Sequence, residues 1–184
     1  MIIDDDIFTK EEKRMVEKEI LSNNFPWFVQ PYSTSTKFPF FSHIGLARNT
    51  DKPNSHVFYV FKEMTERFCR KHKIKIKIIH RHSLNLTHCF PKYTHTDPHV
   101  DHNFKHKVIM FYLNDVSGNT LIFNKKHKKG EPHTFLLEKK PDYKILYKIK
   151  PKQFRVACFD GKYFHAAEFP KNNQQRIVSV STFS

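Results

Sequence analysis

Histidine and aspartate recur closely in the segment HTDPHVDHNFKH, residues 95–106, which contains four histidines and two His-x-Asp pairs. Imidazole nitrogens and carboxylate oxygens are common metal ligands, and residues two apart in a strand point to the same face. Either pair, His95 with Asp97 or His99 with Asp101, could therefore present two ligands together. All four positions have the same parity, so strand geometry alone does not choose between the pairs.

Three residues further along the chain could complete a site. Tyr112 shares the parity of Val108 and Met110 in the apolar run VIMFYLN, and its hydroxyl needs a hydrogen-bond partner if it is buried. His165 follows the apolar segment FRVACFDGKYF and is expected just past the end of a strand. Arg176 opens the apolar run RIVSVSTF, where a buried guanidinium is costly unless an anion accompanies it.

The first third of the chain predicts helices that could support such a site. Thr9 and Glu12 fit a capping box, and the hydrophobic residues after them follow one helical face to about residues 22–24. A second helix, capped by Asn54 or Ser55, has a continuous hydrophobic face. We expect both helices to pack against a core with that face.

Beyond residue 72 the pattern changes from helices to short strands. The segment KIKIKII, residues 73–79, alternates Lys and Ile, which is typical of a strand with one solvated face. Further apolar runs predict strands at 83–88, 107–113, 120–124, 134–138, 144–149, 154–159 and 176–182. Helices followed by several short strands predict an α+β fold built around a β-sandwich or barrel.

The length of 184 residues and the hydrophobic content of 39% favour a single domain over residues 1–184. The acidic N-terminus lacks the features of a secretory signal, and no segment has the roughly eighteen apolar residues of a membrane span. We therefore expect a cytoplasmic protein with no membrane partner. Cys69, Cys89 and Cys158 are widely spaced, which predicts reduced, mostly buried thiols.

The net charge of +14 leaves two interpretations open. A basic surface can bind a polyanion such as nucleic acid, or it can simply be solvated. Lysine outnumbers arginine and is spread along the chain, with the densest cluster in KKHKKG at residues 125–130. Specific phosphate contacts more often use clustered arginines.

The chain contains, in order, a His-x-Asp pair, a Tyr-bearing strand, a distant His and an Arg eleven residues later. This order resembles that of the Fe(II)/2-oxoglutarate-dependent dioxygenases. Within that family, the prolyl 4-hydroxylase-like branch is the most similar. The resemblance extends over residues 80–183 and rests on the motifs HVD, FYLND, GNTLIF and FDGKYFHAAEFP and on the Arg-led strand. It implies a double-stranded β-helix, or jelly roll, with N-terminal flanking helices, so that residues 1–72 would support a core over 73–184.

The family pattern also distinguishes the two His-x-Asp pairs. In the family, this motif lies just before the loop that leads into the Tyr-bearing strand, which implies His99 and Asp101 as metal ligands. His165 is then implied as the third ligand. Two histidines and one carboxylate form the ligand set of non-haem Fe(II) oxygenases.

The resemblance implies Fe(II), 2-oxoglutarate as co-substrate and O2. Arg176 would bind the distal carboxylate of 2-oxoglutarate, and Tyr112 would add a hydroxyl group. Many prolyl hydroxylase relatives have Tyr-Pro before the first ligand, whereas this chain has Phe90-Pro91. Asn85 or Thr87 could replace the missing phenol.

The implied activity is hydroxylation of an unactivated C–H bond, with a protein or peptide side chain as the favoured substrate. The basic charge keeps a nucleic acid or nucleotide as an alternative substrate. A different class of function is a non-enzymatic basic binding module with zinc held by histidines, for which the candidates are His95, His99, His102 and His106. The Gly-poor, Lys- and Phe-rich composition is typical of an AT-rich phage or viral genome, which would place the protein in the host cytoplasm.

Overall fold

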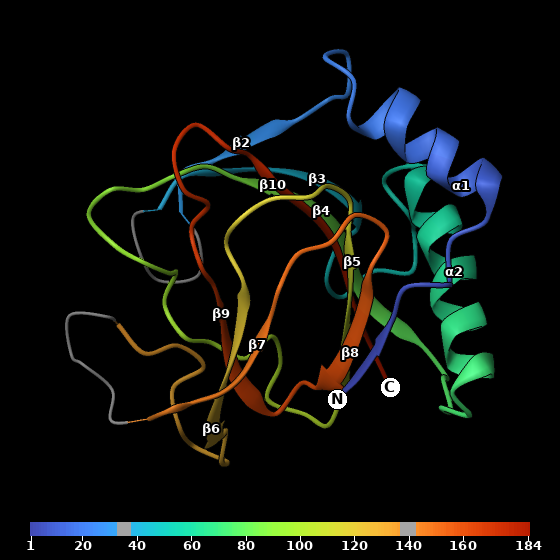
Figure 1. Ribbon diagram of the computed structural model, residues 1–184. Helices are drawn as coiled ribbons and strands as arrows, with labels where there is room; N and C mark the ends of the chain where they lie inside the picture. The colour runs from blue at the N-terminus through green and yellow to red at the C-terminus, as the bar shows by residue number, and fades with distance from the viewer. Residues whose placement is uncertain (33–37, 137–142) are drawn as a thin grey trace.

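The computed structural model describes residues 1–32, 38–136 and 143–184, which form mostly β-strands with two helices (Figure 1). The N-terminal part contains β1 (Ile2–Asp4), α1 (Lys10–Met15), a π-helical continuation η1 (Val16–Ile20), β2 (Phe28–Gln30), β3 (Phe40–Leu46) and α2 (Val57–Lys71). The remainder contains β4 (Ile79–Thr87), β5 (Lys107–Tyr112), β6 (Thr120–Lys126), β7 (Ile145–Ile149), β8 (Val156–Asp160), β9 (Tyr163–Ala167) and β10 (Arg176–Phe183). Residues 1–72 thus contribute three strands as well as the helices.

The strands form two sheets that pack against each other. The larger sheet has the order β1-β8-β5-β10-β4-β3-β2, and the smaller has the order β7-β6-β9. Every strand pair is antiparallel. Hydrophobic side chains from both sheets meet in one buried cluster, formed by Val108, Met110, Tyr112, Ile122, Ile149, Ala157, Phe159 and Val178. The predicted α+β fold with a two-sheet core is confirmed at this level.

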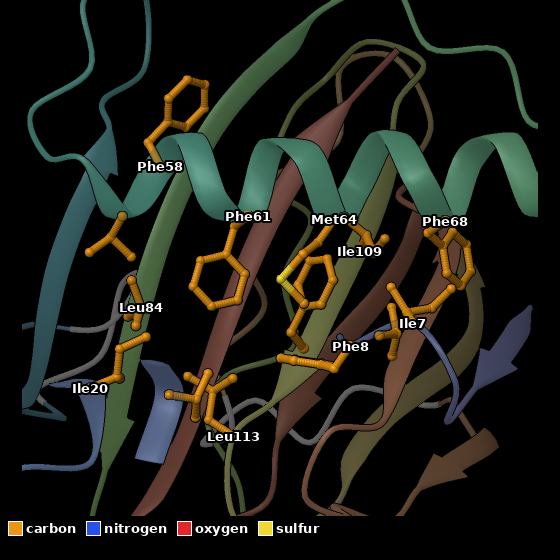
Figure 2. Close-up of a cluster of buried hydrophobic side chains, with 14 of the residues drawn as sticks. Ile7, Phe8, Ile20, Phe58, Phe61, Met64, Phe68, Leu84, Ile109 and Leu113 are labelled. Carbon is orange, nitrogen blue, oxygen red and sulfur yellow. The ribbon is translucent and has the colours of Figure 1, made fainter. Parts of the chain in front are cut away.

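The helices cover the opposite face of the larger sheet (Figure 1). Figure 2 shows Phe61, Met64 and Phe68 of α2 directed toward Leu84 on β4 and Ile109 on β5. Residues three and four apart share a helix face, so the hydrophobic spacing in the sequence predicted this contact correctly. Among the described helices, none has the length and apolar character needed to cross a membrane.

The predicted capping box begins α1. Thr9 Oγ1 accepts a hydrogen bond from the Glu12 amide at 3.2 Å, and Glu12 Oε2 accepts one from the Thr9 amide at 2.8 Å. The Glu12 carboxylate also accepts two hydrogen bonds from Arg67 on α2, at 2.7 and 2.8 Å. This bidentate pair joins the two helices, because the fork of the guanidinium matches both carboxylate oxygens.

The expected strand over residues 73–79 is wrong in most of its length, because β4 begins only at Ile79. The alternation agrees with burial in part, since Ile74 and Ile76 pack partly against the helix-side core while Ile78 is 54% exposed. The backbone amides of Lys77 and Ile78 donate to the Ser184 carbonyl instead of joining a ladder. The expected strand at 134–138 extends beyond the described residues.

The cysteines are unpaired, and Cys69 and Cys158 are buried while Cys89 is exposed. Burial raises the pKa of the Cys69 thiol to about 11 and that of Cys158 to about 12. Both buried thiols are therefore protonated and unreactive near neutral pH.

Phe61→Ala is expected to lower the free energy of unfolding by about 3–5 kcal/mol, because it leaves a cavity between helix and sheet. The Phe61 ring is fully buried and lies 5.3 Å from the Phe111 ring and 5.2 Å from the His82 ring. Urea unfolding followed by circular dichroism would measure the change. Tyr59→Ala is the control, because Tyr59 lies on the same helix but is 56% exposed, and it should change the value by under about 1 kcal/mol. Equal losses in the two variants would contradict this assignment of the core.

Candidate metal and co-substrate site

A cavity of about 350 Å³ lies between the two sheets. His99, Asp101 and His165 all line it, and so does Arg176. The strands contribute alternate residues to its wall, as expected for side chains that share one sheet face. These residues are Arg81, Asn85 and Thr87 from β4, Val108 and Met110 from β5, and Arg176, Val178 and Val180 from β10.

The three side chains that were predicted as ligands come together on this wall. His99 and His165 form a bridge in which each backbone amide donates to the other residue's carbonyl at 2.9 Å. Their ring centroids are 4.6 Å apart. Asp101 Oδ2 lies 3.4 Å from His165 Nε2. His165 is thus a neighbour of His99 and Asp101 in the cavity, although it lies 64 or more positions away from them in the sequence.

His165 lies within β9, not past the end of a strand as the sequence suggested. It faces Ile122 across the β6–β9 pair. The expectation failed because the turn at Gly161 and Lys162 is so short that the chain enters a new strand almost at once. The apolar residues on both sides of this turn belong to two strands in different sheets.

Backbone carbonyls fix the tautomer of both imidazoles. His99 Nδ1 lies 3.0 Å from the Asp97 carbonyl oxygen, and His165 Nδ1 lies 3.2 Å from that of Tyr163. A carbonyl oxygen only accepts hydrogen bonds, so each Nδ1 donates, and Nε2 is the nitrogen that carries the lone pair when the ring is neutral. Burial and the neighbouring His165 lower the pKa of His99 to about 4. His99 is therefore neutral near pH 7 and suited to bind a metal.

Asp101 supplies a buried carboxylate. Its Oδ1 accepts hydrogen bonds from Arg81 at 3.2 Å and from Arg48 at 3.4 Å. Its Oδ2 is buried and has no hydrogen-bond partner among the described residues. Burial alone would raise the pKa of Asp101, but the adjacent His165 and the Arg81 charge outweigh it and hold that pKa well below the usual range. Asp101 is thus ionised, with one oxygen available to a ligand.

In the described ranges, no group of three His, Cys, Asp or Glu side chains is arranged to hold a metal ion as it stands. The fit of a metal to His99, Asp101 and His165 rests instead on their donor chemistry. Two imidazoles with Nε2 lone pairs and a carboxylate with an unpartnered buried oxygen line one cavity. This combination suits a divalent ion such as Fe(II), and the assignment of the three as ligands is a proposal.

Neither residue of the upstream pair, His95 or Asp97, is among the described residues that line the cavity. The two pairs do not lie in one continuous strand. His95 and His99 each form an isolated bridge, and Pro98 lies between them. The shared parity of the two pairs therefore does not place them on one face.

Arg176 lies at the head of β10 and is only 2% exposed. Its Nε donates to the Gly118 carbonyl at 2.8 Å, and its Nη2 donates to Thr120 Oγ1 at 2.7 Å. Burial lowers the pKa of Arg176, which shows that its charge is held at a cost. A buried guanidinium that lines a cavity and bonds to uncharged oxygens is suited to an anionic ligand.

Tyr112 contacts this arginine both directly, with the guanidinium carbon 5.7 Å from its ring centroid, and through Thr120. The Tyr112 hydroxyl donates to Thr120 Oγ1 at 2.7 Å, the same atom that accepts from Arg176. Among the described residues, Thr120 lines the cavity and Tyr112 does not. Sequence reasoning missed Thr120, although it lies in the GNTLIF motif. Tyr112 is therefore placed to orient Arg176 through Thr120.

Asn85 and Thr87, named from the sequence as possible replacements for the missing phenol, both line the cavity from β4. In the β4–β10 ladder Asn85 lies opposite Val178, and Thr87 lies opposite Arg176. Asn85 Oδ1 is buried without a hydrogen-bond partner among the described residues. Both side chains are thus close to the guanidinium end of the cavity.

Comparison with known proteins identifies the fold. No family model and no curated protein matches the sequence. A 2OG-Fe(II) oxygenase family oxidoreductase from Burkholderia pseudomallei matches with a TM-score of 0.63, at 13% identity, over 97% of this chain and 81% of that chain. HygX from Streptomyces hygroscopicus, solved with nickel and 2-oxoglutarate, matches with a TM-score of 0.64, at 10% identity, over 100% and 82%. The chain has the 2OG-Fe(II) oxygenase fold.

At such low identity, this similarity establishes the fold alone. A prolyl-4-hydroxylase from Pseudomonas putida gives a TM-score of only 0.46, at 10% identity, over 84% of this chain and 76% of that chain. That value does not support a specific likeness to the prolyl branch. Both the prolyl branch and a phage or viral source stay predictions.

Within this oxygenase fold, the four histidines of the zinc hypothesis do not gather at one point. The His99 ring faces His165, whereas the His102 and His106 rings contact each other at a centroid distance of 4.8 Å. His102 Nε2 lies 2.8 Å from Thr182 Oγ1. The arrangement does not favour a zinc-binding module.

Two arginines that line the oxygenase-fold cavity were not predicted. Arg81 lies on the same face of β4 as Asn85 and Thr87, so strand parity could have found it. Arg48 lies in the loop after β3, and no sequence pattern indicated it. Both contact the carboxylate of Asp101.

Proposed function

We propose that this protein is an Fe(II)- and 2-oxoglutarate-dependent oxygenase, built on a double-stranded β-helix, that hydroxylates an unactivated C–H bond. One observation carries the proposal. Two imidazoles of fixed tautomer, an ionised carboxylate and a buried arginine line the same cavity. A metal-binding triad and an anion-binding arginine in one concave site are the two elements that this chemistry requires.

In this proposal, His99 and His165 bind the metal through Nε2, and Asp101 binds it through Oδ2. The hydrogen bonds from Nδ1 to backbone carbonyls hold both rings in orientation and keep Nε2 unprotonated. Bound Fe(II) and 2-oxoglutarate supply the activation of O2, with 2-oxoglutarate converted to succinate and CO2. The chain itself contributes the geometry of the three donors.

Arg176 binds the distal carboxylate of 2-oxoglutarate. Thr120 holds one edge of the guanidinium by accepting from Nη2, and the Gly118 carbonyl accepts from Nε. The guanidinium is thereby oriented before the anion arrives, so less side-chain entropy is lost on binding. Asn85 and Thr87, on the adjacent strand, are placed to contact the same co-substrate.

Apolar side chains form the wall between the arginine and the three donors. Val108 and Met110 from β5 and Val178 and Val180 from β10 line this part of the cavity. They limit the access of water, and a drier site strengthens the charge–charge contact at Arg176. We propose a protein or peptide side chain as the substrate, since a C–H bond beside the metal could be presented by a flexible segment.

Anaerobic reconstitution with Fe(II), followed by oxygen, is expected to give succinate from 2-oxoglutarate. The measurement is succinate released per enzyme with and without Fe(II), in the presence of separate peptide and oligonucleotide pools. Zinc-loaded protein is the control, because zinc lacks the redox chemistry of iron. The proposal would be contradicted if the protein bound zinc tightly and the Fe(II)-treated protein released no more succinate than the metal-free protein.

A further inference from the structure

Two arginines share a single oxygen of the Asp101 carboxylate. Arg81 Nη1 and Arg48 Nη2 lie 3.2 and 3.4 Å from Oδ1. The Arg81 side chain is 25% exposed and that of Arg48 is 48% exposed, whereas the carboxylate is 4% exposed. The contact therefore brings two cationic charges to one buried anionic charge at the wall of the cavity.

This arginine pair lies far from Arg176 on the same sheet. In the β4–β10 ladder, Arg176 is opposite Thr87, whereas Arg81 is opposite Thr182. Six residues of strand separate these two positions, so the backbones of Arg81 and Arg176 are roughly 20 Å apart. The proposed metal ligands line the same cavity, and Asp101 contacts both Arg48 and Arg81. Arg48 and Arg81 are thus at the opposite end from the proposed co-substrate carboxylate.

The charges at this end are unbalanced. If Asp101 ligates a divalent cation, part of its negative charge is taken up by the metal, and the two guanidinium groups lose much of their compensation. On the basis of the proposed function, we infer that Arg48 and Arg81 form a binding site for an anionic group of the substrate, a phosphate or a carboxylate. Guanidinium groups suit both anions, because their forked donors match paired oxygens.

Arg48 connects this site to a second cavity. The same side chain lines the metal-site cavity and a neighbouring cavity of about 950 Å³. The second cavity is also lined by Lys77 and by Lys62, whose charge is paired with Glu66 at 3.3 Å, and by Asp51. The exposed Tyr59 and Phe104 rings add apolar surface. A substrate anchored by its anionic group at Arg48 therefore has space for its remaining atoms outside the metal site.

The test is calorimetric titration of inorganic phosphate, and separately of acetate, into the anaerobic protein loaded with Fe(II) and 2-oxoglutarate. Saturating 2-oxoglutarate blocks Arg176, so the measured affinity reports another site. Arg48→Ala is expected to weaken anion binding by roughly tenfold or more, since it removes a charge-assisted hydrogen bond. Arg70→Ala removes the same charge from an exposed position outside both cavities and should leave the affinity unchanged.

Tighter binding of phosphate than of acetate would indicate a phosphate-bearing substrate, and the reverse order would indicate a carboxylate. Equal affinities in the Arg48→Ala and Arg70→Ala variants, or no saturable binding by wild type, would overturn the inference while leaving the proposed oxygenase intact. Failure of wild type to bind Fe(II) and 2-oxoglutarate would overturn the proposed function itself, and the inference with it.

Discussion

Asp101→Ala is expected to reduce Fe(II)-dependent conversion of 2-oxoglutarate by about a hundredfold or more, because a bound metal contributes several kcal/mol to such a reaction. Asp101 is the carboxylate that lines the cavity, and its buried Oδ2 has no hydrogen-bond partner among the described residues. His99→Ala and His165→Ala should cause losses of similar size. Succinate formation, measured on variants whose circular dichroism matches wild type, gives the comparison.

His95→Ala and Asp97→Ala are the matched controls, since they remove the other His-x-Asp pair from the same segment. Both should retain most of the activity, because neither residue is among the described residues that line the cavity. Asp97 contributes its backbone carbonyl to the orientation of His99, and an alanine at this position keeps that carbonyl. Full activity in Asp101→Ala, or loss of iron in a folded His95→Ala protein, would move the site elsewhere.

Arg176→Ala is expected to raise the apparent dissociation constant for 2-oxoglutarate by roughly thirtyfold or more. Removing one partner of a buried charge pair typically costs about 2–5 kcal/mol. Metal binding should be little affected, because Arg176 lies at the far end of the wall from Asp101. An anaerobic titration of 2-oxoglutarate, followed by the absorbance of its complex with Fe(II), measures the change.

Two milder substitutions separate charge from geometry at this position. Arg176→Lys keeps the charge but loses the fork, so its effect should be smaller than that of alanine. Tyr112→Phe removes the hydroxyl that donates to Thr120 and should cost only about 1 kcal/mol. Unchanged affinity in Arg176→Ala would show that the co-substrate binds elsewhere or does not bind at all.

Local patterns in the sequence predicted the strands with apolar runs. The expected strands at 107–113, 120–124 and 176–182 correspond closely to β5 (Lys107–Tyr112), β6 (Thr120–Lys126) and β10 (Arg176–Phe183). The pattern did not separate β9 from β8, because both are apolar and the turn between them is short. The alternation at 73–79 agrees with the partial burial of Ile74 and Ile76 but not with the exposed Ile78, and partial burial without a neighbouring strand does not make a ladder.

The site was predictable where a single strand determines which side chains share a face. Asn85 and Thr87 have the same parity in β4 and share the cavity wall, and the position of Arg176 at the head of an apolar run indicated a buried charge. Thr120 and Arg48 were not found, because their roles depend on contacts between segments that are distant in the sequence. The contact of Arg48 and Arg81 with one carboxylate arises only when the loop after β3 and strand β4 meet the His-x-Asp segment.

The most direct test of the metal assignment is a crystal structure of the protein loaded anaerobically with Fe(II) and 2-oxoglutarate, with anomalous scattering recorded at the iron edge. We expect one strong peak bounded by Nε2 of His99, Nε2 of His165 and the carboxylate of Asp101, with the distal carboxylate of 2-oxoglutarate at Arg176. A peak at His95 and Asp97, a peak beside His102 and His106, or no iron peak in the cavity would contradict the account.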